Sequence, residues 1–447
     1  MPTDFDLLRS LEDEPRTPST VDVRRAIADG RRRRRLRRGI GYTSAAAVTA
    51  LAVTGASFAA SGLSTKTPQN AAATGGAAAS SAPKGQYTIP GTPGWKAPVA
   101  TAPTTCSLIQ LPTPDNVPMA LVSSGDPTGH YFVGRSYPKG GYQAVIWHDD
   151  KAEKVLLPGD DEESLTDVNS SGVAVGWSFQ GHTEEGTVQV PYVYRDGQVS
   201  KLPGVKRGEA RAINEAGAIV GTDDSDALVW PSATAKPIRL PVAAGSMQSA
   251  STGKTGARPQ VTAVDIDEDG TVVGNIGTSR PYVWFADGTH RELPLPTLDG
   301  KPAASGRVFG IRNGWAFGVA DLVSGEAKDP KAPASGLPNP GADGAAARAR
   351  GQLQAVQWNV RTGEVRAVDE FQTGADAVNA QGWQVGINKQ GRAALVTGTA
   401  AQVVLPELAN HEPLSTIANT VSDDGRTIGG QSDDASGTIR AVIWHCQ

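Results

Sequence analysis

The chain has 447 residues, more than one compact hydrophobic core of ordinary domain size accommodates, which indicates more than one structural part. It carries 42 Lys and Arg against 46 Asp and Glu, a net charge of −4, which excludes a nucleic-acid binder acting along its whole length. Two Cys and six scattered His exclude a disulfide-dense miniprotein and most zinc sites, and the 52 Gly and 31 Pro fall below the level of a low-complexity chain.

The N-terminal part combines an Arg cluster with an uncharged span. Residues 1–38 hold 11 Arg, no Lys and 7 acidic residues, and residues 39–63 follow with no charge. A span of this length can cross a bilayer as a helix, and Arg on one side favours a cytoplasmic N-terminus. We therefore predict a cytoplasmic Arg-rich segment (1–38), one transmembrane α-helix or uncleaved signal anchor (39–63), and an extracytoplasmic remainder.

Two other interpretations of this part stay open. A cleavable twin-arginine signal would use Arg34 and Arg35 and end at the small residues Ser57 and Ala59, so that the remainder would be secreted. A solvated tail or a nucleic-acid patch would explain the Arg run, but an apolar span follows it immediately. We favour the membrane anchor and predict no nucleic-acid partner.

The remainder consists of a linker and a repeat region. Residues 64–104 are mostly Ala, Thr, Pro, Gly and Ser, which bury too little apolar surface to fold and predict a flexible linker. Residues 105–447 contain seven copies of a turn followed by an apolar run that ends in Gly, at a mean spacing of about 49 residues. The first copy, ending at Gly134, is looser, and the other six end at Gly176, Gly221, Gly274, Gly318, Gly386 and Gly429.

Two further units accompany this turn. A unit that begins with Ala or Pro and ends three residues later in an aromatic residue supplies Trp147, Tyr194, Trp230, Trp284, Trp358 and Trp444. Its sixth copy is degenerate and ends at Val396. A Leu-Pro pair then closes the copies, except the fifth, which reads Val365 to Val368.

Each copy fits four short strands. Asn or Asp followed by Gly forms the turn between the first two strands, and Pro after the fourth suits an outer edge because it donates no ladder hydrogen bond. Seven such copies predict an all-β fold, a seven-bladed β-propeller with four-stranded blades. A β-solenoid or stacked sandwiches is the alternative.

The two ends of the repeat region complement each other. The chain ends just after a third strand, whereas residues 106–112 resemble a fourth strand without a copy of its own. We predict that this N-terminal strand pairs with the last blade and closes the ring. The pairing places Cys106 beside Cys446, so a disulfide is expected, which suits an oxidising compartment. Two free buried thiols are the alternative.

The long insertions fall on one side of the predicted ring. Residues 180–190 and 322–350 separate second from third strands, and residues 242–259 link the third blade to the fourth. In a propeller these connections share one face, and variable loops on a rigid scaffold form a plausible binding surface. An unknown protein or a cell-surface glycan is the expected ligand, and tolerated insertions without function are the alternative.

Catalytic and metal motifs are weak in this sequence. Asp265, Asp267 and Asp269 match the start of a calcium loop, but position twelve of that loop would be Ile276, which is not a ligand. The same stretch occupies the place of the ordinary repeat turn, so we favour a turn over a metal site. We find no nucleophile, paired-His or cofactor motif and predict neither catalytic residues nor a cofactor.

The recurring turn and the Ala-x-x-Trp unit resemble the repeat of the bacterial extracellular HAF-repeat family, related to WD40-like propellers. The resemblance covers roughly residues 117–447 and implies a secreted or surface repeat domain without catalytic residues. The family's His before the Ala-x-x-Trp unit is replaced here by Gln143, Asp226, Arg280, Gln354 and Arg440. The first 60 residues resemble the short cytoplasmic segments of actinobacterial membrane proteins that accompany sigma factors.

Together these features predict a membrane-anchored extracytoplasmic propeller that binds a ligand without converting it. A second hypothesis is an anti-sigma-like regulator, in which residues 1–38 capture a sigma factor and the propeller senses an external signal. A third is a secreted propeller enzyme whose catalytic residues come from several blades.

Overall fold

The structure is a computed structural model that describes residues 100–139, 141–149, 151–159, 162–183, 186–250, 258–298, 300–321, 353–398, 401–409 and 414–447. The predicted cytoplasmic segment 1–38, the predicted span 39–63 and residues 64–99 of the predicted linker lie outside these described residues. In the part of the chain that the structure describes, no helix is long and apolar enough to cross a membrane.

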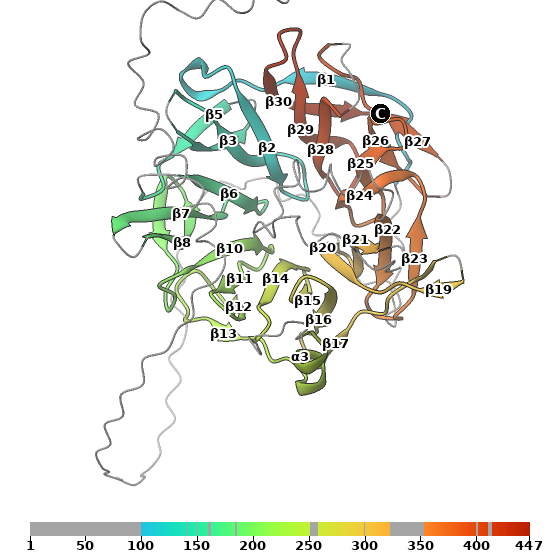
Figure 1. Cartoon of the computed structure of the whole chain (residues 1–447). Coiled ribbons are helices and arrows are strands. Elements are labelled where there is room, and N and C mark those ends of the chain that lie inside the picture. The colour runs from blue at the N-terminus through green and yellow to red at the C-terminus, as the bar shows by residue number, and fades with distance from the viewer. Residues whose placement is uncertain are drawn as a thin grey trace, which may run out of the picture. The chain divides into compact units, whose positions relative to one another are not determined.

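The described residues form seven four-stranded antiparallel sheets, which follow one another as the blades of a β-propeller (Figure 1). Blade one consists of β2 (Ala120–Gly125), β3 (Tyr131–Ser136), β4 (Gln143–His148) and β5 (Lys151–Val155). Blade two consists of β6 (Glu163–Val168), β7 (Ala174–Thr183), β8 (Gly186–Arg195) and β9 (Gln198–Lys201). Blade three consists of β10 (Gly208–Ile213), β11 (Ile219–Asp223), β12 (Ala227–Trp230) and β13 (Ile238–Arg239). Blade four consists of β14 (Val261–Ile266), β15 (Val272–Ile276), β16 (Arg280–Trp284) and β17 (His290–Glu292). Blade five consists of β20 (Gly306–Arg312), β21 (Trp315–Asp321), β22 (Leu353–Asn359) and β23 (Val365–Val368). Blade six consists of β24 (Phe371–Val378), β25 (Gln384–Asn388), β26 (Ala393–Val396) and β27 (Gln402–Val404). Blade seven joins β28 (Thr416–Val421), β29 (Thr427–Asp433) and β30 (Ile439–Cys446) to β1 (Cys106–Gln110).

This architecture confirms the predicted all-β, seven-bladed propeller. The remaining described elements are a short 3₁₀ helix, η1 (Pro114–Asn116), the helix α3 (Ala244–Ala250) and a two-stranded hairpin of β18 (Thr297–Leu298) and β19 (Lys301–Pro302). The cores lie between neighbouring blades, because the clusters of buried side chains draw on adjacent sheets rather than on one.

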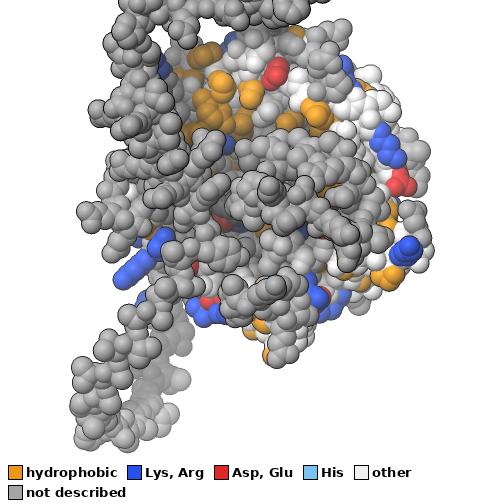
Figure 2. All heavy atoms as spheres, in the orientation of Figure 1, with side chains coloured by type: hydrophobic (Ala, Val, Ile, Leu, Met, Phe, Trp, Pro, Cys, Tyr) orange, Lys and Arg blue, Asp and Glu red, His pale blue; other side chains and the backbone are white. Residues whose placement is uncertain are grey.

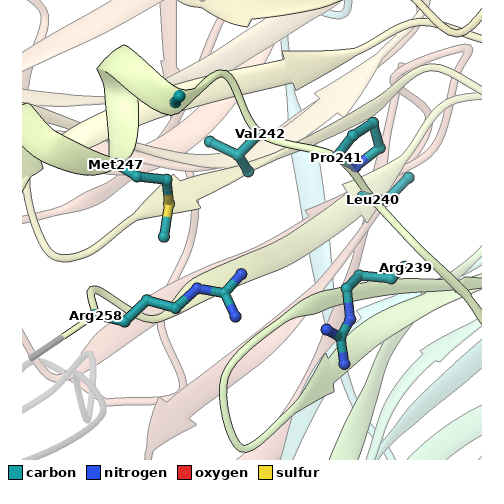
Figure 3. Close-up of a pocket in the computed structure, with 7 residues that line it drawn as sticks. Arg239, Leu240, Pro241, Val242, Met247 and Arg258 are labelled. Atoms are coloured by element: carbon teal, nitrogen blue, oxygen red, sulfur yellow. The ribbon is translucent and has the colours of Figure 1, made fainter.

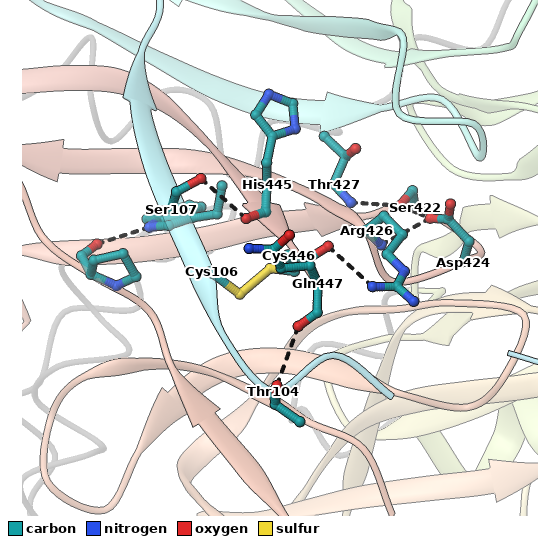
Figure 4. Close-up of a disulfide and its surroundings, with 12 residues drawn as sticks. Thr104, Cys106, Ser107, Ser422, Asp424, Arg426, Thr427, His445, Cys446 and Gln447 are labelled. Atoms are coloured by element: carbon teal, nitrogen blue, oxygen red, sulfur yellow. Dashed lines mark hydrogen bonds between the residues drawn. A yellow bond between two sulfur atoms is a disulfide. The ribbon is translucent and has the colours of Figure 1, made fainter. Parts of the chain in front are cut away.

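The ring closes as predicted, by pairing the first strand with the last. The β1 and β30 strands run antiparallel, with Cys106 opposite Cys446, and a disulfide joins these two residues (Figure 4). The backbone N–H of Thr104 donates to the carbonyl of Gln447 at 2.8 Å, so the pairing continues past the disulfide. The two ends of the repeat region, 340 residues apart, thus belong to one blade.

A β-bulge in the innermost strand explains the repeated Gly. In each of the seven described blades the pairing of the first and second strands has a register shift, and blade six has two. Gly221 lies opposite such a shift, and a Cβ there would lie 2.0 Å from the carbonyl oxygen of Glu209. Only glycine fits this close backbone approach.

The repeat spacing predicts Gly429 as the structural glycine of blade seven, whereas the strand register places Gly430 at the bulge. Gly430 pairs with Ala418 at the bulge, and its Cβ would lie 2.1 Å from the carbonyl oxygen of Ile417. A Cβ on Gly429 would meet side-chain atoms at 2.9 Å instead. Two adjacent glycines made the spacing ambiguous, and the bulge decides between them.

The repeated Trp and the repeated Leu-Pro pair are bonded to each other across blade junctions. Each of the five Trp is buried, and its indole N–H donates to the carbonyl of the Pro that follows the fourth strand of the preceding blade. The bonds are Trp147 to Pro112 (2.7 Å), Trp230 to Pro203 (2.9 Å), Trp284 to Pro241 (2.6 Å), Trp358 to Pro294 (2.6 Å) and Trp444 to Pro406 (2.8 Å). We call each of these a Trp–Pro bond.

Two junctions lack a Trp–Pro bond. Between blades one and two, Tyr194 replaces Trp, and the carbonyl of Pro158 accepts from Ser178 and Gln180 of blade two. Between blades five and six both partners are missing, because Val396 replaces Trp and no Leu-Pro pair follows β23. The two departures from the repeat noted in the sequence therefore meet at one junction.

Candidate binding site between blades three and four

The three acidic residues of the calcium-like stretch act in the packing of blades. Asp265 and Asp267 accept backbone N–H groups from the first strand and turn of blade five at 2.7–3.0 Å. Asp269 accepts from Thr271 within its own turn and pairs with Arg361 of blade five. Among the described residues no group of three or more His, Cys, Asp or Glu side chains is placed to hold a metal ion. These carboxylates therefore join blade four to blade five.

Other polar side chains near the inner strands have the same role. The innermost strand of a blade has an unpaired edge, and side chains of the preceding blade bond to it. Asp167 accepts the backbone N–H of Ile213 at 2.9 Å, and Asn419 donates to the carbonyl of Val122 at 2.7 Å. Burial raises the pKa of the Asp167 carboxyl to about 6. A raised pKa here reflects a structural position, although such shifts also mark catalytic groups.

An ion-pair cluster connects turns of non-adjacent blades. Arg312, at the end of β20, donates through Nε and Nη2 to the two carboxylate oxygens of Asp423 in blade seven, and through Nη1 to Glu268 in blade four. All three side chains are largely buried. The carboxylates of Asp423 and Glu268 hold the pKa of the Arg312 guanidinium well above its usual value, against the opposing effect of burial.

The structure has an open groove at the link between blades three and four (Figure 3). Its volume is about 590 Å³, within the usual range for ligand sites. It lies along the connection that leads from the outer strand β13 of blade three, through helix α3, to the inner strand β14 of blade four. The lining residues are Arg239, Leu240, Pro241, Val242, Ala244, Met247 and Arg258.

The two arginines of the groove are held by one buried carboxylate. Arg258 Nη2 lies 2.6 Å from Asp226 Oδ1, and Arg239 Nη2 lies 3.1 Å from Asp226 Oδ2. The Asp226 side chain is 5% exposed, whereas the arginine side chains are 60% and 55% exposed. A buried anion thus fixes two solvent-facing cations at one side of the groove.

The apolar wall of the groove is fixed by contacts within blade three and between blades three and four. Leu240 donates its backbone N–H to the carbonyl of Ala227 at 2.9 Å, and the next residue, Pro241, accepts the Trp–Pro bond from Trp284. The backbone N–H of Ala243, just before α3, donates to the Tyr282 hydroxyl at 3.2 Å. Leu240, Val242 and Met247 pack against the core between these blades, so the wall is part of the rigid fold.

No protein-family model matches this chain, and no curated protein matches it. Solved structures are similar at low identity. YCF48 bound to D1 peptide shares 12% identity over 78% of this chain and 99% of that chain, with a TM-score of 0.42. YCF48 from Cyanidioschyzon merolae shares 12% over 77% and 99% (TM-score 0.43), and the extracellular domain of the one component system BT4673 from B. thetaiotaomicron shares 10% over 75% and 39% (TM-score 0.41). At this identity the likeness concerns the fold alone.

The groove coincides with one of the three insertions predicted to form a binding surface. Residues 242–259 do link blades three and four, and they supply α3 and Arg258. Residues 180–190 lie mostly in β7 and β8, so this insertion extends two strands rather than forming an irregular loop. Residues 322–350 lie outside the described residues.

Sequence reasoning missed Arg239 and Arg258 because neither belongs to a repeat unit. The available signal was Asp226, the only acid among the five residues that stand where the HAF repeat has His. Gln354, at the same position of blade five, donates to the carbonyl of Val368, and Arg280 and Arg440 pair with acids of their own blades. Asp226 instead places a negative charge at this position, and two arginines pair with it.

The visible surface around blades three and four carries charged side chains of both signs in the view of Figure 2. Lys and Arg side chains gather along the lower margin, in the region of β12, β13 and β17, whereas hydrophobic side chains gather over blades one and seven. Arg207, just before blade three, is half-exposed and pairs with Asp224 at 3.6 Å. The cations that line the groove itself are Arg239 and Arg258.

Proposed function

We propose that this protein is a non-catalytic binding module, displayed outside the cytoplasm by an N-terminal membrane anchor, with its ligand site in the groove between blades three and four. The observation that supports a binding site here is the pair of solvent-facing arginines, which buried Asp226 holds beside an apolar wall. Positioned charges beside apolar surface are typical of binding sites. The repeat pattern supports membership of the HAF-repeat family, and a protein or cell-surface glycan is the expected partner.

The binding function is tested with the full chain in detergent or nanodiscs. Immobilised wild-type protein is offered extracytoplasmic extracts, purified cell-wall glycans and peptide pools, and compared with the double variant Arg239→Ala/Arg258→Ala. A specific ligand retained by wild type and lost by the double variant supports the proposal. Retention that is equal in both proteins removes the groove as the site. Turnover of any offered compound would contradict a purely binding role.

The location is tested separately from binding. Externally added protease should degrade the propeller of intact cells and leave an N-terminal fragment that fractionates with the membrane. A processed protein in the medium would favour the cleaved signal instead. The Arg-rich segment 1–38 also supports a regulatory role, and a peptide of these residues that binds a sigma factor would favour that second function.

A further inference from the structure

We infer that the groove recognises the C-terminal carboxylate of a peptide whose last side chain is apolar. The inference rests on the proposed binding function and specifies its ligand. Arg239 and Arg258 would bind the carboxylate, and the wall of Leu240, Val242 and Met247 would contact the terminal side chain.

The charge of the groove disfavours a dianion. Two guanidinium groups share the carboxylate of Asp226, each within ion-pair distance of a different oxygen. Asp223 lies 4.0 Å from Arg239, but its Oδ1 also accepts the backbone N–H groups of Ser225 and Asp226. The two arginines and the two aspartates together carry no net charge, which disfavours a dianion such as phosphate. A single carboxylate would be held by the exposed guanidinium donors instead.

The arginines keep donors for a ligand. A guanidinium has five N–H donors in a planar fork that suits a carboxylate. Among the contacts of the described residues, Arg258 uses only its Nη2 on Asp226, and Arg239 uses its Nη2 on Asp226 and Asp223. More than half of each side chain is exposed, so the remaining donors face the solvent side of the groove. In Figure 3 both guanidinium groups lie below the Val242 and Met247 side chains.

The apolar wall lies directly beside the cations. Arg239 and Leu240 are adjacent in the chain, and Val242 follows two residues later, so a ligand must carry an apolar group close to its charge. In a terminal residue the carboxylate and the side chain leave the same Cα, which meets this requirement within one residue. Met247 provides a flexible surface that adapts to different apolar side chains. The groove is open, so the rest of the peptide has a path to solvent.

The test compares free and amidated C-termini with the full-length protein. Two fluorescein-labelled hexapeptide pools, randomised at the first five positions and ending in Leu, differ only in a terminal carboxylate or amide. We expect fluorescence polarisation to show micromolar binding of the acid pool and at least tenfold weaker binding of the amide pool. Arg239→Ala and Arg258→Ala should each weaken acid binding about tenfold.

Arg207→Ala provides the matched control. Arg207 lies in the segment before β10, its side chain is 54% exposed, and it pairs loosely with Asp224 at 3.6 Å. It should leave acid binding unchanged, and tryptophan fluorescence should show that all variants remain folded. Equal binding of acid and amide pools would overturn the inference, and so would equal loss in the Arg207 variant. If neither pool binds but another ligand still requires Arg239 and Arg258, the inference fails while the proposed function stands.

Discussion

Removing the disulfide by the double substitution Cys106→Ala/Cys446→Ala should destabilise the propeller without opening its ring. The disulfide closes a loop of 340 residues, for which chain entropy sets an upper limit of about 5–6 kcal/mol. Measured effects commonly reach ~2–4 kcal/mol, and we expect a loss in that range. The physical reason is that the reduced chain gains freedom mainly in its unfolded state.

The folded ring should survive because other bonds hold the closure. Five residue pairs join β1 to β30, and the backbone N–H of Leu111 donates to the carbonyl of Ala441 at 2.9 Å. The Trp–Pro bond between Trp147 and Pro112 then ties the same strand to blade one. Native-state circular dichroism and tryptophan fluorescence of the variant should therefore match those of the wild type.

The assay is equilibrium unfolding in urea, followed by tryptophan fluorescence. Reduced wild type should reproduce the loss of the double variant, since both lack the covalent link. Ser107→Ala, on an exposed position of β1, serves as the control and should change stability by less than about 0.5 kcal/mol. An unfolding free energy that differs by less than about 1 kcal/mol between oxidised and reduced protein would refute the entropic reasoning.

Three further predictions address the repeat and the inner strands. Gly430→Ala should cost about 3 kcal/mol in urea unfolding, because its Cβ meets backbone, and Gly429→Ala about 1 kcal/mol; the opposite order would contradict the assigned register. Trp230→Phe should cost about 2 kcal/mol by leaving the carbonyl of Pro203 without its donor, and unchanged stability would show that the Trp–Pro bond contributes nothing. Burial raises the pKa of Asp167 from 3.8 to about 6. Between about pH 4 and pH 6 the carboxyl is therefore protonated in the folded state and ionised in the unfolded state. The stability from protonated Asp167 is full below about pH 4 and is lost as the pH rises through 6. Asp167→Asn should therefore be more stable than wild type by about 1–2 kcal/mol at pH 8, and an equal pH profile between pH 4 and 8 would contradict this.

The sequence predicted the blades because their local chemistry repeats. The turn glycines and the aromatic residues recur at regular positions, and the incomplete first and last copies indicated the closure by β1 and the disulfide of Cys106 and Cys446. Local turn preferences and periodicity suffice for such a reading.

The bonds between blades were not predictable in the same way. The Trp and Leu-Pro units were visible, but Trp358 bonds to Pro294, 64 residues away, and spacing alone does not reveal that pairing. The choice between Gly429 and Gly430 depended on a bulge that leaves no separate mark in the sequence.

The position of the groove in the fold was predictable from the sequence, but the residues that form its charged side were not. The insertion 242–259 indicated the correct link between blades, but the site needs Arg239 and Arg258 to meet at Asp226, which lies just before β12. The repeat aligns equivalent positions of the blades, and Arg239 and Arg258 stand outside it. The deviation at Asp226 was the visible signal.

The Arg312–Asp423 pair has a mechanical consequence for the junction between blades five and six. Blades five and six lack a Trp–Pro bond, whereas Arg312 of blade five reaches past blade six to Asp423 of blade seven. Asp423 also accepts the backbone N–H of Ala380, in the turn of blade six, at 3.0 Å. The Asp423 carboxylate of blade seven thus bonds to blade six and to blade five at the same time. Loss of that carboxylate would let the amides of β24 exchange with solvent before those of other inner strands, so that opening of the ring would begin at this blade.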